Sequence, residues 1–325
     1  MKKTSNRKKT NKGKKSSKQL KIPAIKFKKL NTKRLAVDLI ILACIILVGV
    51  SGWLWWDKVM LNPDRALQDA LANSLKTRSI TKTVDQTSPA SGFNQVTYLS
   101  LFPQSEGSYT RTKLSQGIGS NTTTVTTETI GAPTADYVRY TDISGGANQP
   151  GVQRLQSMLG VWAKREQDLS KGQRISFLNE GLFGVIPFGY LGDDQQSQIL
   201  GIINQKNLYK YTSASRSMEN KRPVYVYTMS INPSNLVEVL RDYSQLSGLG
   251  DPSQLNPEQY KGAGDIKILL TVDIFSRQIV RIQYSTGRVE NYTGHNLYRP
   301  LNLPGDTIPV EELQRRLQGG AGANA

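Results

Sequence analysis

The clearest pattern along the chain is a pair of stretches in which apolar and polar residues alternate. The first covers residues 266–274, and the second covers residues 280–284 after a turn near Ser276 and Arg277. Because successive side chains of a strand point to opposite faces of a sheet, this period of two predicts an antiparallel hairpin with one face toward a core. The predicted core face consists of Ile266, Ile268, Leu270, Val272, Ile274, Val280, Ile282 and Tyr284.

Strand composition also dominates residues 78–144. Threonine, valine and tyrosine recur there in short stretches that are separated by glycine, serine and proline. Threonine this dense is typical of exposed antiparallel strands and not of helices. A further strand is expected over residues 224–231, where Tyr225, Tyr227 and Met229 share one face.

Two helices have recognisable starts. Asn62 can cap a helix that Pro63 opens, and leucines then follow at every fourth position. Asn232 and Pro233 repeat this signal before a second apolar stripe. Shorter helices are expected after Asp193 and over residues 309–318.

The order of these elements is a helix, several strands, helices, a hairpin and a last helix. It predicts an α+β domain with one large, curved antiparallel sheet over residues 57–318. Residues 319–325, with the sequence GGAGANA, are expected to form a flexible tail.

One long apolar stretch, residues 35–56, predicts a transmembrane helix. Its 22 residues would reach roughly 33 Å at about 1.5 Å per residue, enough for a hydrocarbon core of about 30 Å. Leu35 opens the stretch, and an interfacial aromatic belt closes it. That belt consists of Trp53, Trp55 and Trp56. Asp38 lies in the first turn, where its carboxylate can reach the lipid headgroups.

Two processing alternatives involve this stretch. Small residues near Gly52 are compatible with a signal-peptidase site, and Cys44 could be taken for a lipid-attachment site. The apolar run continues beyond both positions, which favours a retained anchor and an unmodified membrane thiol. Because Cys44 is the only cysteine, the outer region has no disulfide and must be stabilised by packing.

The charge lies almost entirely before this stretch. Residues 1–34 carry a balance of +15 without any acid, whereas residues 57–325 carry only +3. Excess Lys and Arg mark the cytoplasmic side of a membrane helix, so the N-terminus is expected inside and the larger domain outside the cell membrane. The basic tail is predicted to be disordered, and it serves either to enforce topology or to bind anionic inner-leaflet lipids. Nucleic acid is disfavoured as a partner, because only Phe27 is available for stacking.

The sequence contains little that supports catalysis. His295 is the only histidine and is predicted to lie in a surface loop, and neither a phosphate-binding loop nor a nucleophile elbow occurs. The acidic pairs Asp193-Asp194 and Glu311-Glu312 fit helix starts. We therefore expect no catalytic residues, no metal site and no cofactor. A hydrolase built from two carboxylates distant in sequence stays open.

Residues 181–192, GLFGVIPFGYLG, are apolar, rich in glycine and free of charge. This composition fits either a mobile loop or lid over a binding site, or a buried linker between two elements.

The layout resembles the lipoprotein-carrier half-barrel superfamily, which includes LolA, LppX and LprG. The resemblance is carried by residues 66–84, 222–240, 266–284 and 301–317. It implies a curved antiparallel sheet wrapped over helices and enclosing an apolar cavity for a lipid or a lipidated partner. Family members are usually soluble carriers or lipid-anchored proteins, so a membrane helix would be a departure.

The expected function is therefore that of a membrane-anchored domain of a bacterial cell envelope that binds an apolar ligand without catalysis. A structural or adhesion protein acting through protein–protein contacts is the alternative. The candidate cavity or lid residues are Leu182, Phe183, Ile186, Phe188, Tyr190, Ile268, Leu270 and Val272.

The predicted topology can be tested with added protease on intact cells. Because the basic residues precede the apolar stretch, a tag before Lys2 should be protected while residues beyond Trp56 are cleaved. Immunoblotting of both ends measures this, and protection of a C-terminal tag would show that the orientation is reversed.

Overall fold

The computed structural model describes residues 32–57, 61–88, 92–102, 107–117, 122–132, 134–145, 150–166, 184–247, 255–297 and 301–318. The chain forms two compact units, Met1–Leu54 and Trp55–Ala325. Of the basic tail expected over residues 1–34, residues 1–31 lie outside the described residues, and so does the expected tail of residues 319–325. Residues 32–34 instead form the start of a helix.

The first unit contains most of helix α1 (Thr32–Trp55), in close agreement with the helix predicted over residues 35–56. Its apolar side chains from Leu39 to Leu54 are exposed. Among the described side chains, which omit those of residues 32–36 and 38, no helix is both long and apolar enough to cross a membrane. The membrane crossing and the orientation stay predictions.

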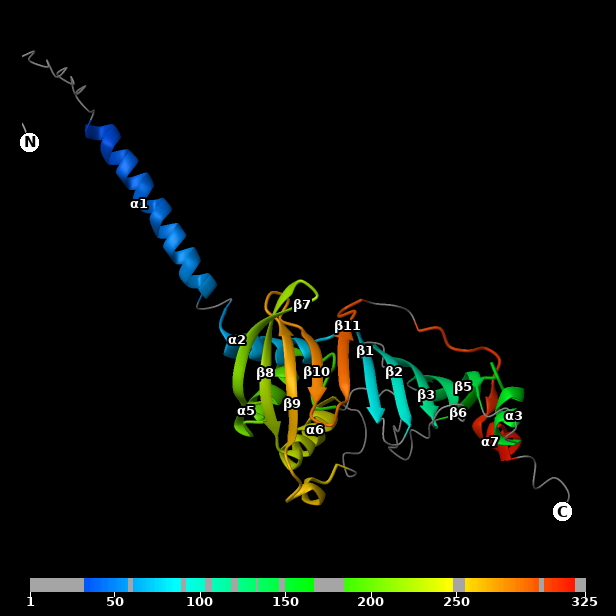
Figure 1. Cartoon of the computed structure of the whole chain (residues 1–325). Coiled ribbons are helices and arrows are strands. Elements are labelled where there is room, and N and C mark those ends of the chain that lie inside the picture. Colours follow the sequence, from blue (N-terminus) through cyan, green and yellow to red (C-terminus); the bar gives the residue numbers. More distant parts are fainter. Residues whose placement is uncertain are drawn as a thin grey trace, which may run out of the picture. The chain divides into compact units, whose positions relative to one another are not determined.

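The second unit is built on one open sheet. Within the described residues its strand order is β12-β6-β5-β4-β3-β2-β1-β11-β10-β9-β8-β7, and the sheet is curved and unclosed (Figure 1). Neighbouring strands are antiparallel except β12 and β6, which are parallel. The strands are β1 (Ile80–Ser88), β2 (Phe93–Phe102), β3 (Gly107–Gln116), β4 (Thr123–Gly131), β5 (Ala135–Ser144), β6 (Ala163–Glu166), β7 (Tyr211–Glu219), β8 (Arg222–Ile231), β9 (Ile266–Asp273), β10 (Ile279–Tyr284), β11 (Val289–Thr293) and β12 (Ile308–Pro309).

The helices cover the sheet at its two ends. They are α2 (Pro63–Leu75), α3 (Pro150–Ser157), α5 (Asp193–Gln205), α6 (Pro233–Ser247), the short 3₁₀ helix η7 (Pro257–Tyr260) and α7 (Val310–Gln318). The caps act as predicted, because the Asn62 side chain accepts a hydrogen bond from the Arg65 amide, and Asn232 accepts one from Asn235. The prediction of an α+β domain with a predominantly antiparallel sheet is confirmed.

The main core lies between α2, α5 and α6 on one side and the sheet from β7 to β2 on the other. Ile199, Val239 and Leu270 are fully buried in it. Burying an aliphatic side chain of this size is worth about 1.5–3 kcal/mol, so this cluster supplies much of the domain's stability.

The predicted hairpin is confirmed as β9 and β10, with one correction. The pairing shifts between Ile279 and Arg281, as it does at a β-bulge. The shift moves Ile279 to the core, where it is 1% exposed, and leaves Val280 half-buried. The prediction that Val280 belongs to the core face was therefore wrong, because strict alternation fails at a bulge.

A smaller core covers the other end of the same sheet face. Cα partners in adjacent strands lie on one face, and the row from Leu99 runs through Thr110, Thr129 and Val138 to Ala163. There α3 and α7 bury Met158, Ala163, Val310 and Leu313. A third cluster, around Ile130 and Tyr137, lies on the opposite face.

The two halves of the sheet meet where β1 pairs with β11, and this seam contains a buried charge cluster. Lys82 Nζ lies 3.9 Å from the Glu290 carboxylate, and their side chains are 9% and 3% exposed. Tyr292 donates to Glu290 at 2.5 Å, and Arg288 donates two hydrogen bonds to the same carboxylate.

These contacts set the charge states in the seam. Burial alone would raise the pKa of Glu290, but the positive charges of Lys82 and Arg288 and the hydrogen bond from Tyr292 hold it below the ordinary 4.5. Burial lowers the pKa of Lys82, and attraction to Glu290 only partly opposes this. The Glu290 carboxylate is therefore ionised near neutral pH. Because the folded pKa of Glu290 is depressed, its contribution to stability is present above the unfolded pKa and is lost as pH falls through the folded value.

We predict that Glu290→Gln destabilises the domain by about 3–5 kcal/mol at pH 7, because it leaves the Lys82 amine buried without its anionic partner. The double variant Lys82→Met/Glu290→Gln should recover much of this loss. Urea unfolding measures both.

The same unfolding experiment, repeated at lower pH, tests the depressed pKa. Below pH 4.5 the wild type should lose more stability than Glu290→Gln, since only the wild type protonates this carboxylate. Equal losses in the two proteins would contradict a depressed pKa at Glu290.

Candidate functional site

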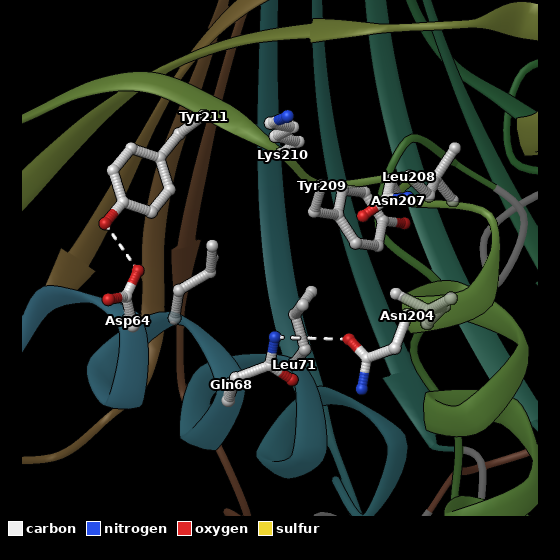
Figure 2. A pocket seen from close by; sticks show the side chains of 11 residues that line it. Asp64, Gln68, Leu71, Asn204, Asn207, Leu208, Tyr209, Lys210 and Tyr211 are labelled. Carbon is white, nitrogen blue, oxygen red and sulfur yellow. Dashed lines mark hydrogen bonds between the residues drawn. The ribbon is translucent and has the colours of Figure 1, made fainter.

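A pocket of about 420 Å³ opens where α5 ends and β7 begins, against the first turns of α2 (Figure 2). We call it the amide-rimmed pocket. Its apolar floor consists of Leu67, Leu71, Ile203, Leu208 and Tyr209, and its polar rim consists of Asp64, Gln68, Asn204, Asn207, Lys210 and Tyr211.

The helical repeat of α2 separates floor from rim. Leu67 and Leu71 lie one turn apart and are buried in the main core, whereas Asp64 and Gln68 are four residues apart on the exposed side. The same separation occurs on α5, where Ile203 is buried and Asn204 is exposed.

Besides α2 and α5, the connection between α5 and β7 also lines the pocket. The amide of Leu208 bonds to the Ile203 carbonyl, and Asn207 adopts a left-handed conformation with φ of 49°. Asparagine tolerates this conformation better than most residues. It reverses the chain, so that Leu208 and Tyr209 point into the core and Lys210 continues the rim.

Two hydrogen bonds link rim residues from distant parts of the sequence. Tyr211 donates to Asp64 at 2.5 Å, and Gln68 Nε2 donates to Asn204 Oδ1 at 3.3 Å (Figure 2). The bond to the Asp64 carboxylate, together with burial, raises the pKa of Tyr211 to about 12. Tyr211 is therefore a neutral phenol at physiological pH.

Other rim groups are available to a ligand. The Asn207 side chain and the Lys210 ammonium have no hydrogen-bond or ion-pair partner within the described part of the chain. Among all the residues that the structure describes, no cluster of three His, Cys, Asp or Glu side chains could hold a metal ion. The pocket thus offers apolar contact below and neutral and charged hydrogen-bonding groups above.

A second hollow, of about 460 Å³, lies on the opposite face of the sheet beside Trp162. Its charged groups are already engaged. Arg139 donates two hydrogen bonds to Glu128 and lies over the Trp162 ring, 4.5 Å from the ring centroid. This hollow therefore has fewer free polar groups to offer than the amide-rimmed pocket.

None of the described residues that were predicted to line a cavity or lid forms part of the amide-rimmed pocket. Ile268, Leu270 and Val272 are buried in the main core. Ile186 and Phe188 are buried there too, Tyr190 is exposed, and Leu182 and Phe183 lie outside the described residues. That these residues line a ligand cavity stays a prediction.

Residues 184–192 follow the buried-linker alternative. The amides of Gly189 and Leu191 bond to the carbonyls of Ser74 and Leu75 at 3.1 and 2.9 Å. Tyr243 donates a hydrogen bond to the Phe188 carbonyl, and the Phe188 ring stacks on Tyr292 at 5.1 Å. Protein groups thus satisfy these backbone amides and carbonyls, as burial of the segment requires.

His295 lies in a turn after β11, in agreement with the prediction of a loop residue, but its side chain is half-buried. It lines two hollows beside the β9–β10 turn. Burial lowers its pKa, and a hydrogen bond involving the Ile279 backbone partly opposes this.

The sequence did not point to the amide-rimmed pocket. Its rim combines common exposed residue types from residues 64–68 and 204–211, and no motif joins these segments. The only local signal for the pocket is the run of polar residues after α5, and such a run is typical of any helix end.

Comparisons with known proteins do not assign the chain to a family. No family model and no curated protein matches it. Among solved structures, the crystal structure of LprF from Mycobacterium bovis matches 75% of this chain and 97% of its own chain, with 12% sequence identity and a TM-score of 0.40. The resemblance to lipoprotein-carrier half-barrels stays a prediction, and the fold rests on the strand order observed in this chain.

The packing of residues 184–192 can be tested by comparing a glycine inside this segment with a glycine outside it. A Cβ at Gly189 would lie 2.5 Å from the Tyr243 hydroxyl, so Gly189→Ala should destabilise the domain by about 1–3 kcal/mol. Gly201, within α5, has open space around its Cα, so Gly201→Ala should stabilise it by about 0.5–1 kcal/mol. Urea unfolding compares the two, and a neutral Gly189→Ala would show that the segment is not packed.

Proposed function

We propose that this protein is a non-catalytic binding protein of the cell membrane, whose outer domain holds a small amphiphilic ligand in the amide-rimmed pocket. The observation that carries the proposal is the contrast between the leucine floor and the polar rim of that pocket. A concave site that joins apolar contact to convergent polar groups, as this pocket does, suits a small ligand with an apolar and a polar part.

The size and chemistry of the pocket restrict the ligand. A volume of about 420 Å³ lies within the range that ligand sites usually occupy. Leu67, Leu71 and Leu208 offer aliphatic contact, whereas Asn207 and Lys210 offer hydrogen bonds at the mouth. A lipid-like group with a polar end, free or attached to a partner protein, satisfies both requirements.

The location is proposed on the sequence. The +15 balance before residue 35 and the tryptophans at 53, 55 and 56 support an anchor whose N-terminus is cytoplasmic. The basic tail would then meet anionic lipids of the inner leaflet, each nearby Lys or Arg being worth about 1 kcal/mol. The outer domain would meet its ligand on the other side of the membrane.

Two adjacent residues of α5 give a matched test of the site. Asn204 lines the pocket, and Gln205 is exposed but does not. A tryptophan at 204 would fill the mouth without touching the core. We predict that Asn204→Trp weakens binding of a soluble, environment-sensitive acyl amphiphile by about tenfold or more, an effect of about 1.4 kcal/mol or greater.

Fluorescence titration of the purified unit of residues 55–325, which has its own core, measures this binding. Gln205→Trp should bind like the wild type, in a saturable, one-to-one manner. Equal weakening by both variants would place the ligand elsewhere. Absence of binding to the wild type would favour the alternative of an envelope protein acting through protein contacts.

A further inference from the structure

The turns between β7 and β8 and between β9 and β10 lie at the same end of the sheet (Figure 1). The register requires this, because Val224 near the start of β8 pairs with Asp273 at the end of β9. The amide of Ile274 also bonds to the Pro223 carbonyl at 3.1 Å, which ties the two turns together.

The chain enters the domain at this end. The Leu61 amide bonds to the Trp56 carbonyl at 3.0 Å, so these two residues are close neighbours. The Leu61 carbonyl then accepts hydrogen bonds from Tyr225 Oη at 2.5 Å and from Arg216 Nη2 at 3.2 Å. Strands β7 and β8 are thus fastened to the residue that follows the apolar stretch by only five positions.

Large apolar side chains are exposed at the same end. Phe275, in the β9–β10 turn, is 52% exposed, and Met218, near the β7–β8 turn, is 64% exposed. The Phe275 ring lies 5.9 Å from the ring of Trp56, which belongs to the predicted interfacial belt. Exposed apolar groups gathered in one place on a soluble domain mark an interaction surface.

The exposed charges at this end are mainly positive. Arg216, Lys221 and Arg222 are exposed. Two neighbouring acids have cationic partners, because Asp273 pairs with Arg222 at 3.8 Å and Glu219 pairs with Arg281 at 3.6 Å, and a third, Asp57, is half-buried. Aromatic and apolar side chains flanked by Lys and Arg are the composition that settles at a membrane surface.

We propose that this end of the domain is a membrane-contact surface, made of Trp56, Met218, Lys221, Arg222 and Phe275. Its partner is the leaflet from which the chain emerges. Phe275 and Met218 enter the headgroup region, and Lys221 and Arg222 meet lipid phosphates. The proposal rests on the proposed anchor but not on ligand binding in the amide-rimmed pocket.

Site-specific fluorescence on the full chain in vesicles tests this. Single cysteines at Phe275, Met218 or Thr286 are introduced with Cys44→Ala and labelled with a polarity-sensitive dye. The vesicles contain phosphatidylcholine and phosphatidylglycerol, with a nitroxide quencher on the headgroup. Thr286 is exposed in the β10–β11 turn, at the opposite end of the strands, and serves as the matched control.

We expect quenching at positions 275 and 218 to exceed quenching at 286 by about twofold or more, as befits groups at the interface. Lys221→Glu/Arg222→Glu should reduce the quenching at position 275. Equal quenching at 275 and 286 would overturn the proposal.

A label on the native Cys44 thiol distinguishes failure of the membrane-contact surface from failure of the anchor. Wild-type protein labelled at Cys44 reports insertion of the anchor through a quencher deep in the acyl chains. A quenched Cys44 with an unquenched position 275 refutes the membrane-contact surface alone. An unquenched Cys44 refutes both the surface and the anchor. Asn204→Trp should leave all of these signals unchanged, because it alters only the amide-rimmed pocket.

Discussion

The pairing of β1 with β11 is the constraint on which the outer domain depends. It joins residues more than two hundred positions apart, for example Thr83 and Asn291, and unites two meanders that run away from it in opposite directions. Closing so long a loop is entropically unfavourable, and the seam must offset that cost. The Lys82–Glu290 contact also fixes the register, since a slip of one residue would move one charge to the other face.

The seam also positions the amide-rimmed pocket. Helix α2 leads into β1 after four residues and lies over β9 and β10, so its exposed side is oriented by the strands on both sides of the seam. Helix α5 follows residues 184–192, whose amides bond to the C-terminal residues of α2. The two helices that supply half of the rim are thus held together by these backbone hydrogen bonds.

Local signals in the sequence predicted local structure well. The caps at Asn62 and Asn232, the strand at residues 224–231 and the β9–β10 hairpin were all visible, because each depends on neighbouring residues. The bulge that turns Val280 outward was not visible, because it depends on pairing. The contact of β1 with β11 and the meeting of Gln68 with Asn204 were equally hidden, because tertiary packing alone brings these segments together.

Residues 184–192 show why composition could not decide between a lid and a core segment. Freedom from charge and a high glycine content suit both. The decision comes from backbone groups, because a segment can be buried only if its amides and carbonyls find partners. Here Ser74 and Leu75 accept from two amides, while Tyr209 and Tyr243 donate to the carbonyls of Val185 and Phe188. The glycine at 189 leaves the space that the Tyr243 hydroxyl occupies. In this segment glycine therefore permits close approach, and the tyrosines that satisfy the backbone are as necessary to its burial as its own apolar side chains.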